Sequence, residues 1–339
     1  MKTLENGQLM RNDLKNQTFK YYIRLITRFI SLILAIIILT FTLVEYSPLN
    51  PYKVIMADAH LKVEQKEVLV EKWGLKKPIS TKISIWINNA SKGDLGESLY
   101  FNKNVVTIIK DGATNSFVLM LTSWVLTLVI GVVLGILMGL YKDSLFDNVV
   151  KGFAYLFSST PSFWVGILIL LVFAVHLKLF PTGMAYPIGK SINDVTLSQR
   201  IHHMVLPCLT LTITSLSNIL LHTRTKIIET LQSDYALYDK ARGYSDFRII
   251  LRHGIRNILL PIITFHFSSI GELFGGSTLT ETVFSYPGLG SITVLAGIKG
   301  DVYLLLGVTI IMAIFVFSGN LIADILYPLV DPRIKEVNI

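Results

Sequence analysis

The chain has 339 residues, of which 52% are hydrophobic and only 16% are charged, and its mean hydropathy is +0.56. Soluble domains carry about 25% charged residues, so this composition excludes a soluble globular protein. The net charge of +8 does not indicate nucleic-acid binding, because the basic residues cluster beside apolar runs, as they do in membrane proteins. The single cysteine, Cys208, excludes a disulfide framework and a cysteine-based metal site, and we expect it to be a small buried residue.

The amino-terminal part of the chain predicts one membrane helix followed by a long external region. Residues 1–22 are polar, and we expect a cytoplasmic extension there. Residues 23–46 form the first transmembrane helix, since about 20 apolar residues cross a bilayer. This run is too long for a signal peptide and has no small-residue cleavage site. Residues 47–111 form an external segment, mainly helical, with short helices at 63–75 and 83–99.

Five further apolar runs follow, so the sequence predicts an all-α polytopic membrane protein with six transmembrane helices. The five runs belong to a core of residues 112–330 and lie at about 114–140, 149–179, 204–223, 258–280 and 303–328. Lysine and arginine concentrate in the amino-terminal segment, in the loops 141–151 and 224–257, and in the tail 331–339. The short outer loops hold only Lys190, Arg200 and Lys299. The positive-inside rule therefore places both termini in the cytoplasm.

The loop 224–257 is the longest polar interruption of this core, and a simple connection between helices could be much shorter. Ser233 followed by Asp234 predicts a helix start, and Gly243 predicts a left-handed stop about ten residues later. Ser245 predicts the start of a second helix. We expect two short helices joined by a Gly-Tyr turn at a membrane surface. A solvated basic loop is the alternative interpretation.

Several motifs suggest a chemistry that their context does not support. The stretch GMAYPIGKS (183–191) resembles a phosphate-binding loop, but its glycines are one residue too far apart and it joins two spans. The histidines, His202 and His203 among them, lack metal-ligand spacing with a carboxylate. We therefore expect no metal site, and interfacial hydrogen bonds for these histidines. Hydrolase signatures are also missing from the sequence.

An ionisable residue lies deep inside the predicted fifth span. Glu272 sits between Gly271 and the pair Gly275 and Gly276. A charged group at this depth usually faces a bundle interior or a water-filled path, and glycines let a ligand approach closely. We therefore assign Glu272 and these three glycines to a candidate substrate path that favours a cationic substrate. A protonated or internally paired glutamate is the alternative. His266 would lie on another face of a continuous helix.

A set of motifs occurs in order along the chain, namely TPSFWVGILIL (160–170), LPCL (206–209), the segment 233–261, LTETVFSYPGLG (279–290) and DPRIK (331–335). In these motifs the chain resembles the permease subunits of ABC importers for dipeptides, oligopeptides and nickel, in particular the first of their two paired permeases. The resemblance covers about residues 22–335. It implies the fold of a type I ABC importer transmembrane domain.

The resemblance also implies roles for particular residues. It makes the loop 224–257 a cytoplasmic coupling loop that docks on a separate ATPase subunit, through Ser233, Asp234, Tyr235, Ala236, Ala241, Arg242, Gly243, Tyr244 and Ser245. Residues that support this loop would be Arg224, His253, Arg256, Asn257 and Pro261. An outer motif would comprise Glu281, Pro287, Gly288 and Gly290. The Glu-Ala-Ala triplet of importers in general would fall at 237–239, where this chain has Leu-Tyr-Asp.

The implied function is that of a permease subunit in an ATP-driven importer. The cargo would be a small peptide, nickel or a metal chelate, delivered by an extracellular substrate-binding protein. The other partners would be a second homologous permease in a heterodimer, two ATPase subunits and membrane lipid, in the cell membrane of a bacterium. ATP and magnesium would be bound by the ATPase subunits, and this chain would be no enzyme and would bind no cofactor or nucleic acid. A secondary transporter or channel that works without an ATPase is the alternative.

Overall fold

The structure, a computed structural model, describes the backbone of residues 2–48, 50–57, 62–72, 74–190, 194–255, 262, 266–267 and 269–330. Side chains are described from residue 23 to 322 within these ranges, except at positions 54, 57, 65, 69 and 72. The predictions for Arg256, Asn257, Pro261 and the tail 331–339 lie outside the described residues. The regular elements of the described part are helices, as the sequence predicts. The chain divides into two compact units.

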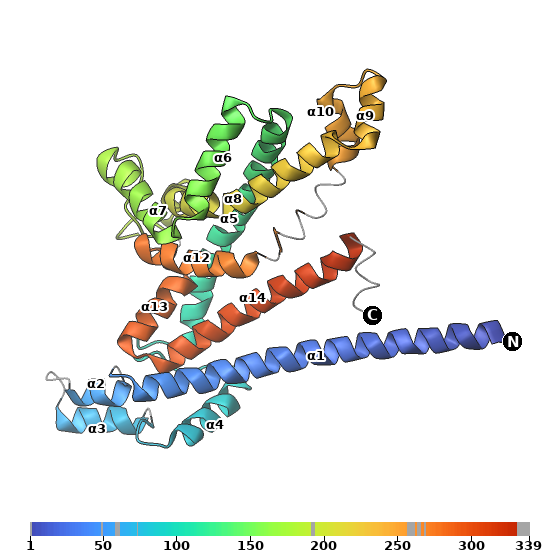
Figure 1. Cartoon of the computed structure of the whole chain (residues 1–339). Coiled ribbons are helices and arrows are strands. Elements are labelled where there is room, and N and C mark those ends of the chain that lie inside the picture. Colours follow the sequence, from blue (N-terminus) through green and yellow to red (C-terminus); the bar gives the residue numbers. More distant parts are fainter. Residues whose placement is uncertain are drawn as a thin grey trace. The chain divides into compact units, whose positions relative to one another are not determined.

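One unit holds the chain through Val106 together with Ala296–Phe317. Its helices are α1 (Lys2–Tyr46), α2 (Pro51–Ala57), α3 (Val63–Lys72) and α4 (Ile79–Ala90). The helix α1 is one unbroken rod, so the boundary expected at residue 22 does not interrupt the helix (Figure 1). Trp86 of α4 is buried against Ile37 and Phe41 of α1 and against Leu306. These contacts attach α4 to the first apolar helix.

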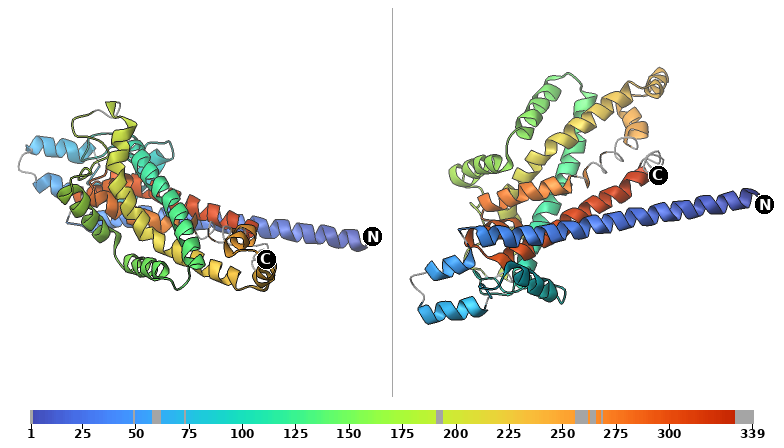
Figure 2. Two further views of the ribbon diagram at one scale, coloured as in Figure 1. Left: turned by 90° about the horizontal axis from the view of Figure 1, so that it is seen from above. Right: turned by 60° about the horizontal axis from the view of Figure 1, so that its bottom comes forward.

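The other unit holds residues from Thr107 to Leu295 and from Ser318 to Val330. Its helices are α5 (Val105–Leu140), α6 (Leu145–Ser158), α7 (Ser162–Ile169) with its π-helical continuation η1 (Leu170–His176), α8 (Leu197–Leu231), α9 (Asp234–Ala241), α10 (Asp246–Ile249) with its π-helical continuation η3 (Ile250–Gly254), and α12 (Ile270–Val283). The helices α13 (Leu289–Lys299) and α14 (Val302–Val330) have residues in both units. The helix α8 packs against α6, α7 and α12, and α9 and α10 follow at the end of α8 away from α7 (Figures 1 and 2).

The predicted spans agree with the structure except at one position. In the part of the chain that the structure describes, four helices are long and apolar enough to cross a membrane, within α1, α5, α8 and α14. The predicted span 149–179 is bent, because α6 and the α7–η1 helix meet at an angle of 113°, and this pair counts as one broken span if it crosses the membrane. The cause is Pro161, which lacks an N–H and disfavours a helical conformation at Thr160. The predicted span 258–280 lies partly outside the described residues.

Small residues let α5 approach α8 closely. Gly135 and Gly139 lie four residues apart on one face of α5, and a Cβ atom at either position would collide with α8, at Thr223 and at Ile227 respectively. Helices of membrane proteins pack closely at such small residues. Ile227 is fully buried in a cluster that includes Ile250 of η3. Ile227 and Ile250, which belong to the loop 224–257, are therefore part of the same apolar core as α8.

Candidate functional site

The loop 224–257, which the resemblance makes the coupling loop, contains two short helices joined by a tight turn, as the sequence predicts. The helices α9 and α10 begin directly after Ser233 and Ser245, but neither serine side chain makes a capping hydrogen bond. The Ser233 hydroxyl instead donates to the carbonyl of Thr230 at 2.6 Å. Between the helices, Gly243 has φ +85°, a conformation that residues with a Cβ atom rarely adopt.

A hydrogen bond between a histidine and a carboxylate joins the two arms of the coupling loop. Nε2 of His253, in η3, lies 2.9 Å from Oδ2 of Asp239, in α9. The N–H of Tyr244 donates to the Asp239 carbonyl at 3.1 Å, which closes the turn. Only 5% of Asp239 is exposed, so its carboxylate faces inward. Importers in general would have the triplet Glu-Ala-Ala at positions 237–239, and Asp239 is the acidic residue there in this chain. Asp239 therefore holds the loop together and does not face a partner protein.

The turn is further packed by one arginine. The Arg242 guanidinium carbon lies 5.6 Å from the ring centroids of both Tyr238 and Tyr244. Across the same turn, Nζ of Lys240 lies 3.0 Å from a carboxylate oxygen of Asp246. Cation–π contacts at exposed sites contribute about 0.5–1 kcal/mol each. The turn is thus held by several weak contacts in addition to the Asp239–His253 pair.

The coupling loop exposes large apolar side chains. Leu237 and Tyr238 on α9 are 56% and 64% exposed, and Phe247 and Leu251 on the second arm are 59% and 53% exposed. Ala236 is fully buried, so α9 has one face against the protein and one face outward. A polar loop with a fixed backbone and exposed apolar residues has the properties of a docking surface for another protein.

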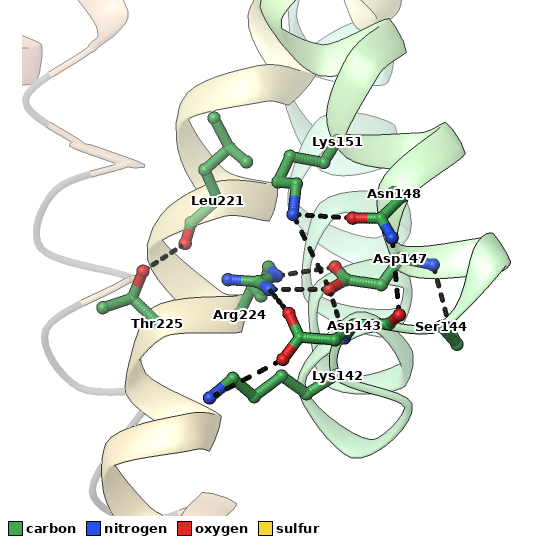
Figure 3. A network of polar contacts seen from close by, with 9 residues as sticks. All are labelled: Lys142, Asp143, Ser144, Asp147, Asn148, Lys151, Leu221, Arg224 and Thr225. Atoms are coloured by element: carbon green, nitrogen blue, oxygen red, sulfur yellow. Dashed lines mark hydrogen bonds and ion pairs between the residues drawn. The ribbon is translucent and has the colours of Figure 1, made fainter.

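A buried ion pair fixes α8 to α6 just before the coupling loop (Figure 3). Arg224 of α8 donates from Nε and from Nη2 to the two carboxylate oxygens of Asp147, each at 2.6 Å. Asp147 is fully buried, and it also accepts the N–H of Asp143 at 2.9 Å. The Ser144 hydroxyl caps α6 by accepting the N–H of Asp147. Arg224 therefore supports the loop, as expected, through a partner that the sequence did not indicate.

The outer motif is organised by a buried carboxylate. Glu281 is fully buried and accepts the Ser116 hydroxyl at 2.6 Å and the N–H of Ser291 at 3.1 Å. The Ser116 hydroxyl in turn accepts the N–H of Leu289 at 2.7 Å. The Glu281 carboxylate therefore sits at the amino end of α13, where a helix dipole stabilises negative charge. A Cβ atom at Gly288 would collide with this carboxylate, which explains the glycine.

Two neighbouring residues complete this motif. The carbonyl of Pro287 accepts the side-chain amide of Asn115 at 2.9 Å, so the Pro-Gly turn is attached to α5. Tyr286 is buried, and desolvation together with the nearby Glu281 carboxylate raises the pKa of its phenol to about 12. The phenol is therefore neutral at physiological pH. Of the four predicted residues, Pro287, Gly288 and Gly290 lie in this turn and at the start of α13, and Glu281 lies near the end of α12.

The candidate substrate path contains a pocket beside Glu272. Glu272 is exposed on α12 and lines this pocket together with Gly276, whereas Gly275 faces open space. The sequence predicts that His266 and Glu272 lie on different faces of one continuous helix. This prediction is wrong, because both residues line the pocket. The reason is that α12 begins only at Ile270, after a turn at Ser269.

The remaining sequence candidates have structural roles. His202 and His203 lie within hydrogen-bonding distance of the carbonyls of Leu179 and Gly183, at 3.0 and 2.9 Å. The prediction that they make local hydrogen bonds is confirmed. Cys208 is buried, as expected. Sequence reasoning missed Asp147 and Ser116, whose partners lie 77 and 165 residues away in the chain, and it also missed the Asp239–His253 pair.

The apolar helical spans of the described residues define a class, the helical multi-pass membrane proteins. A family model described as binding-protein-dependent transport system inner membrane component matches residues 131–336. The chain belongs to this family. It is the permease subunit of a binding-protein-dependent ABC importer, a multi-pass protein of the inner membrane that is not itself catalytic.

Known proteins agree with this assignment. The oligopeptide transport system permease protein AppB of Bacillus subtilis is 33% identical over 93% of this chain and 99% of that protein. The di/tripeptide transport system permease protein DppB of Pseudomonas aeruginosa is 29% identical over 88% of this chain and 94% of its own length. A chain of the MetNI methionine ABC transporter in an inward-facing conformation has the same fold, with a TM-score of 0.54 and 16% identity over 66% of this chain and 97% of that chain.

Proposed function

We propose that this chain is the first of two paired permeases in an importer for short peptides, with nickel or a metal chelate as the second candidate cargo. The relatives named above are permeases for oligopeptides and di- or tripeptides, which supports a peptide cargo. Two ATPase subunits and an extracellular binding protein complete the complex. Both termini are cytoplasmic, because lysine and arginine concentrate on that side of the predicted spans.

The coupling loop carries this proposal. Its exposed residues Leu237, Tyr238, Phe247 and Leu251 form a surface that suits a groove on an ATPase subunit. The Asp239–His253 pair and the Gly243 turn keep the two arms in one arrangement. The loop thus moves as a body when the ATPase subunits bind ATP and magnesium.

The permease converts this movement into helix rearrangement and performs no covalent step. The loop continues from α8, and the Arg224–Asp147 ion pair fixes α8 to α6. Displacement of the loop therefore moves both helices. Two permeases would enclose a path that opens alternately to the binding protein and to the cytoplasm.

Reconstitution into proteoliposomes tests the proposal. The two permeases, the ATPase subunits and the binding protein should together import labelled trialanine when ATP is supplied on the cytoplasmic side. The same permeases without ATPase subunits should import none. ATP-independent uptake by this chain alone would instead support the secondary transporter, and import of nickel but not trialanine would support the second cargo.

A further inference from the structure

A polar pocket of about 180 Å³ lies between α5, α7, α8 and α12. A single water needs only about 10–15 Å³ on this measure, so the pocket has room for several heavy atoms. Pockets that enclose a whole ligand span about 300–1,000 Å³, so this pocket suits one end of a cargo molecule. The residues relevant to its chemistry are Glu272 and His266, Thr127 of α5, and Asn218 of α8.

His266, one of the residues that line this pocket, has a ring nitrogen without a partner among the described residues. Its Nε2 lies 2.9 Å from the Trp124 carbonyl, which can only accept, so Nε2 carries the proton of the neutral ring. Nδ1 is then a lone-pair acceptor, and it has no hydrogen-bond partner among the residues that the structure describes. The ring is only 2% exposed and stacks on Trp124 with centroids 4.3 Å apart, so its orientation is fixed.

Thr127 presents a second polar atom without a partner. Its side chain is 1% exposed, and Oγ1 makes no hydrogen bond within the described part of the chain. Leaving a buried polar group unpaired costs about 1–3 kcal/mol. Thr127 and His266 both line the pocket, so a bound molecule that reaches their two unpartnered atoms would offset this cost.

The charges of the pocket select the kind of molecule. The Glu272 carboxylate and His266 Nδ1 only accept hydrogen bonds, and no lysine or arginine is among the described residues that line the pocket. A group with several N–H donors and a positive charge complements this set, whereas a carboxylate would be repelled. We propose that the pocket binds a primary ammonium group of the cargo, such as the free amino terminus of a short peptide. This inference rests on the proposed function, because it concerns the cargo of the same importer.

Equilibrium binding to the purified complex of both permeases and the ATPase subunits tests the inference. Labelled trialanine should bind, and N-acetyl-trialanine, which lacks the ammonium group, should bind at least about tenfold more weakly, the loss expected for one charge-assisted hydrogen bond. Glu272→Gln should weaken trialanine binding by a similar factor, and Glu272→Asp should restore part of it. Equal binding of both peptides, or unchanged binding by Glu272→Gln, would overturn the inference.

A valine at Thr127 separates ligand binding from a structural role. Thr127→Val removes an unpaired hydroxyl at constant shape, so the melting temperature should stay the same or rise, while trialanine binding should weaken about two- to tenfold. Thr280→Val is the matched control, because Thr280 is fully buried and also unpartnered among the described residues, but does not line the pocket. Identical binding by both variants would contradict the proposal.

Uptake measurements keep this inference distinct from the proposed function. In proteoliposomes with the binding protein, the unaltered complex should import trialanine, and Glu272→Gln should import it at least about tenfold more slowly with unchanged subunit assembly. A complex that imports no peptide in its unaltered form would overturn the proposed function. Import by Glu272→Gln at the unaltered rate would overturn only the role of the pocket.

Discussion

Arg224 of α8 and Asp147 of α6 form a bidentate ion pair, with both nitrogen–oxygen distances at 2.6 Å and the carboxylate fully buried. The planar guanidinium matches a carboxylate in this way, and an ammonium group does not. The pair joins the first residue of the coupling loop 224–257 to the amino end of α6. It therefore fixes the direction in which α8 carries movement of the loop to the rest of the unit.

Removal of one partner should be more harmful than removal of both. Arg224→Met leaves the Asp147 carboxylate buried without its cation, and this should lower the free energy of unfolding by about 3–5 kcal/mol. The double variant Asp147→Leu with Arg224→Met should recover most of that stability, because no charge remains buried. Thermal melting of the purified complex measures both. A double variant less stable than the single one would contradict this view of the pair.

Gly243→Val should uncouple ATP hydrolysis from transport without loss of membrane insertion. Valine at a φ of +85° is strained by about 1–3 kcal/mol, so the turn between α9 and α10 should rearrange. Gly189→Val is the matched control, since Gly189 also has a φ of +85° and open space around it, but lies outside the coupling loop. Substrate-stimulated ATP hydrolysis should be lost only in the first variant. Normal stimulation in Gly243→Val would refute the prediction.

Leu237→Asp should weaken binding of the ATPase subunits by about tenfold or more. Leu237 is exposed on α9, and an aspartate there would place a charge without a partner in an apolar interface. Ile188→Asp provides the control, because Ile188 is 87% exposed and belongs to a predicted outer loop. Co-purification of the ATPase subunits with each variant measures the effect. Equal recovery for both variants would show that α9 is not the docking helix.

Glu281→Gln should destabilise the protein by about 1.5–3 kcal/mol, the range for hydrogen bonds to a charged group. Glutamine keeps the shape but loses the charge at the amino end of α13. Gly288→Ala should also destabilise the protein, because the new methyl group overlaps the Glu281 carboxyl group, whereas Gly297→Ala meets no neighbouring atom. Melting temperatures should fall for the first two variants only. A stable Gly288→Ala variant would contradict the assigned geometry.

Local signals in the sequence were sufficient for much of the fold. The helix starts after Ser233 and Ser245 and the left-handed turn at Gly243 follow from residues within one short stretch, and the structure has them. Pro161 also signalled a helix break in the sequence, but the apolar residues on both sides of it favoured the prediction of a single span. The bend shows that a proline after a polar Ser-Thr pair outweighs hydropathy there.

The partners of the buried charges could not be predicted in the same way. Arg224 and Asp147 are 77 residues apart, and Ser116 and Glu281 are 165 apart, so no periodicity or spacing connects them. His266 and Thr127 reach one pocket only because α5 contacts the segment before α12, where Trp124 and His266 share two hydrogen bonds. One signal was available: Thr214, Ser215 and Asn218 interrupt an apolar span, and all three line that pocket.

The central claim is that α9 of the coupling loop docks on an ATPase subunit in the cytoplasm. Cysteine crosslinking at Tyr238→Cys tests it most directly, because Tyr238 is 64% exposed and the native Cys208 is buried and does not compete. In membranes that contain the whole complex, a short bifunctional maleimide should join Tyr238→Cys to an ATPase subunit that carries a cysteine in its docking groove. Labelling of Tyr238→Cys from the outside of intact cells by a membrane-impermeant maleimide, with no crosslink to the ATPase, would contradict the account.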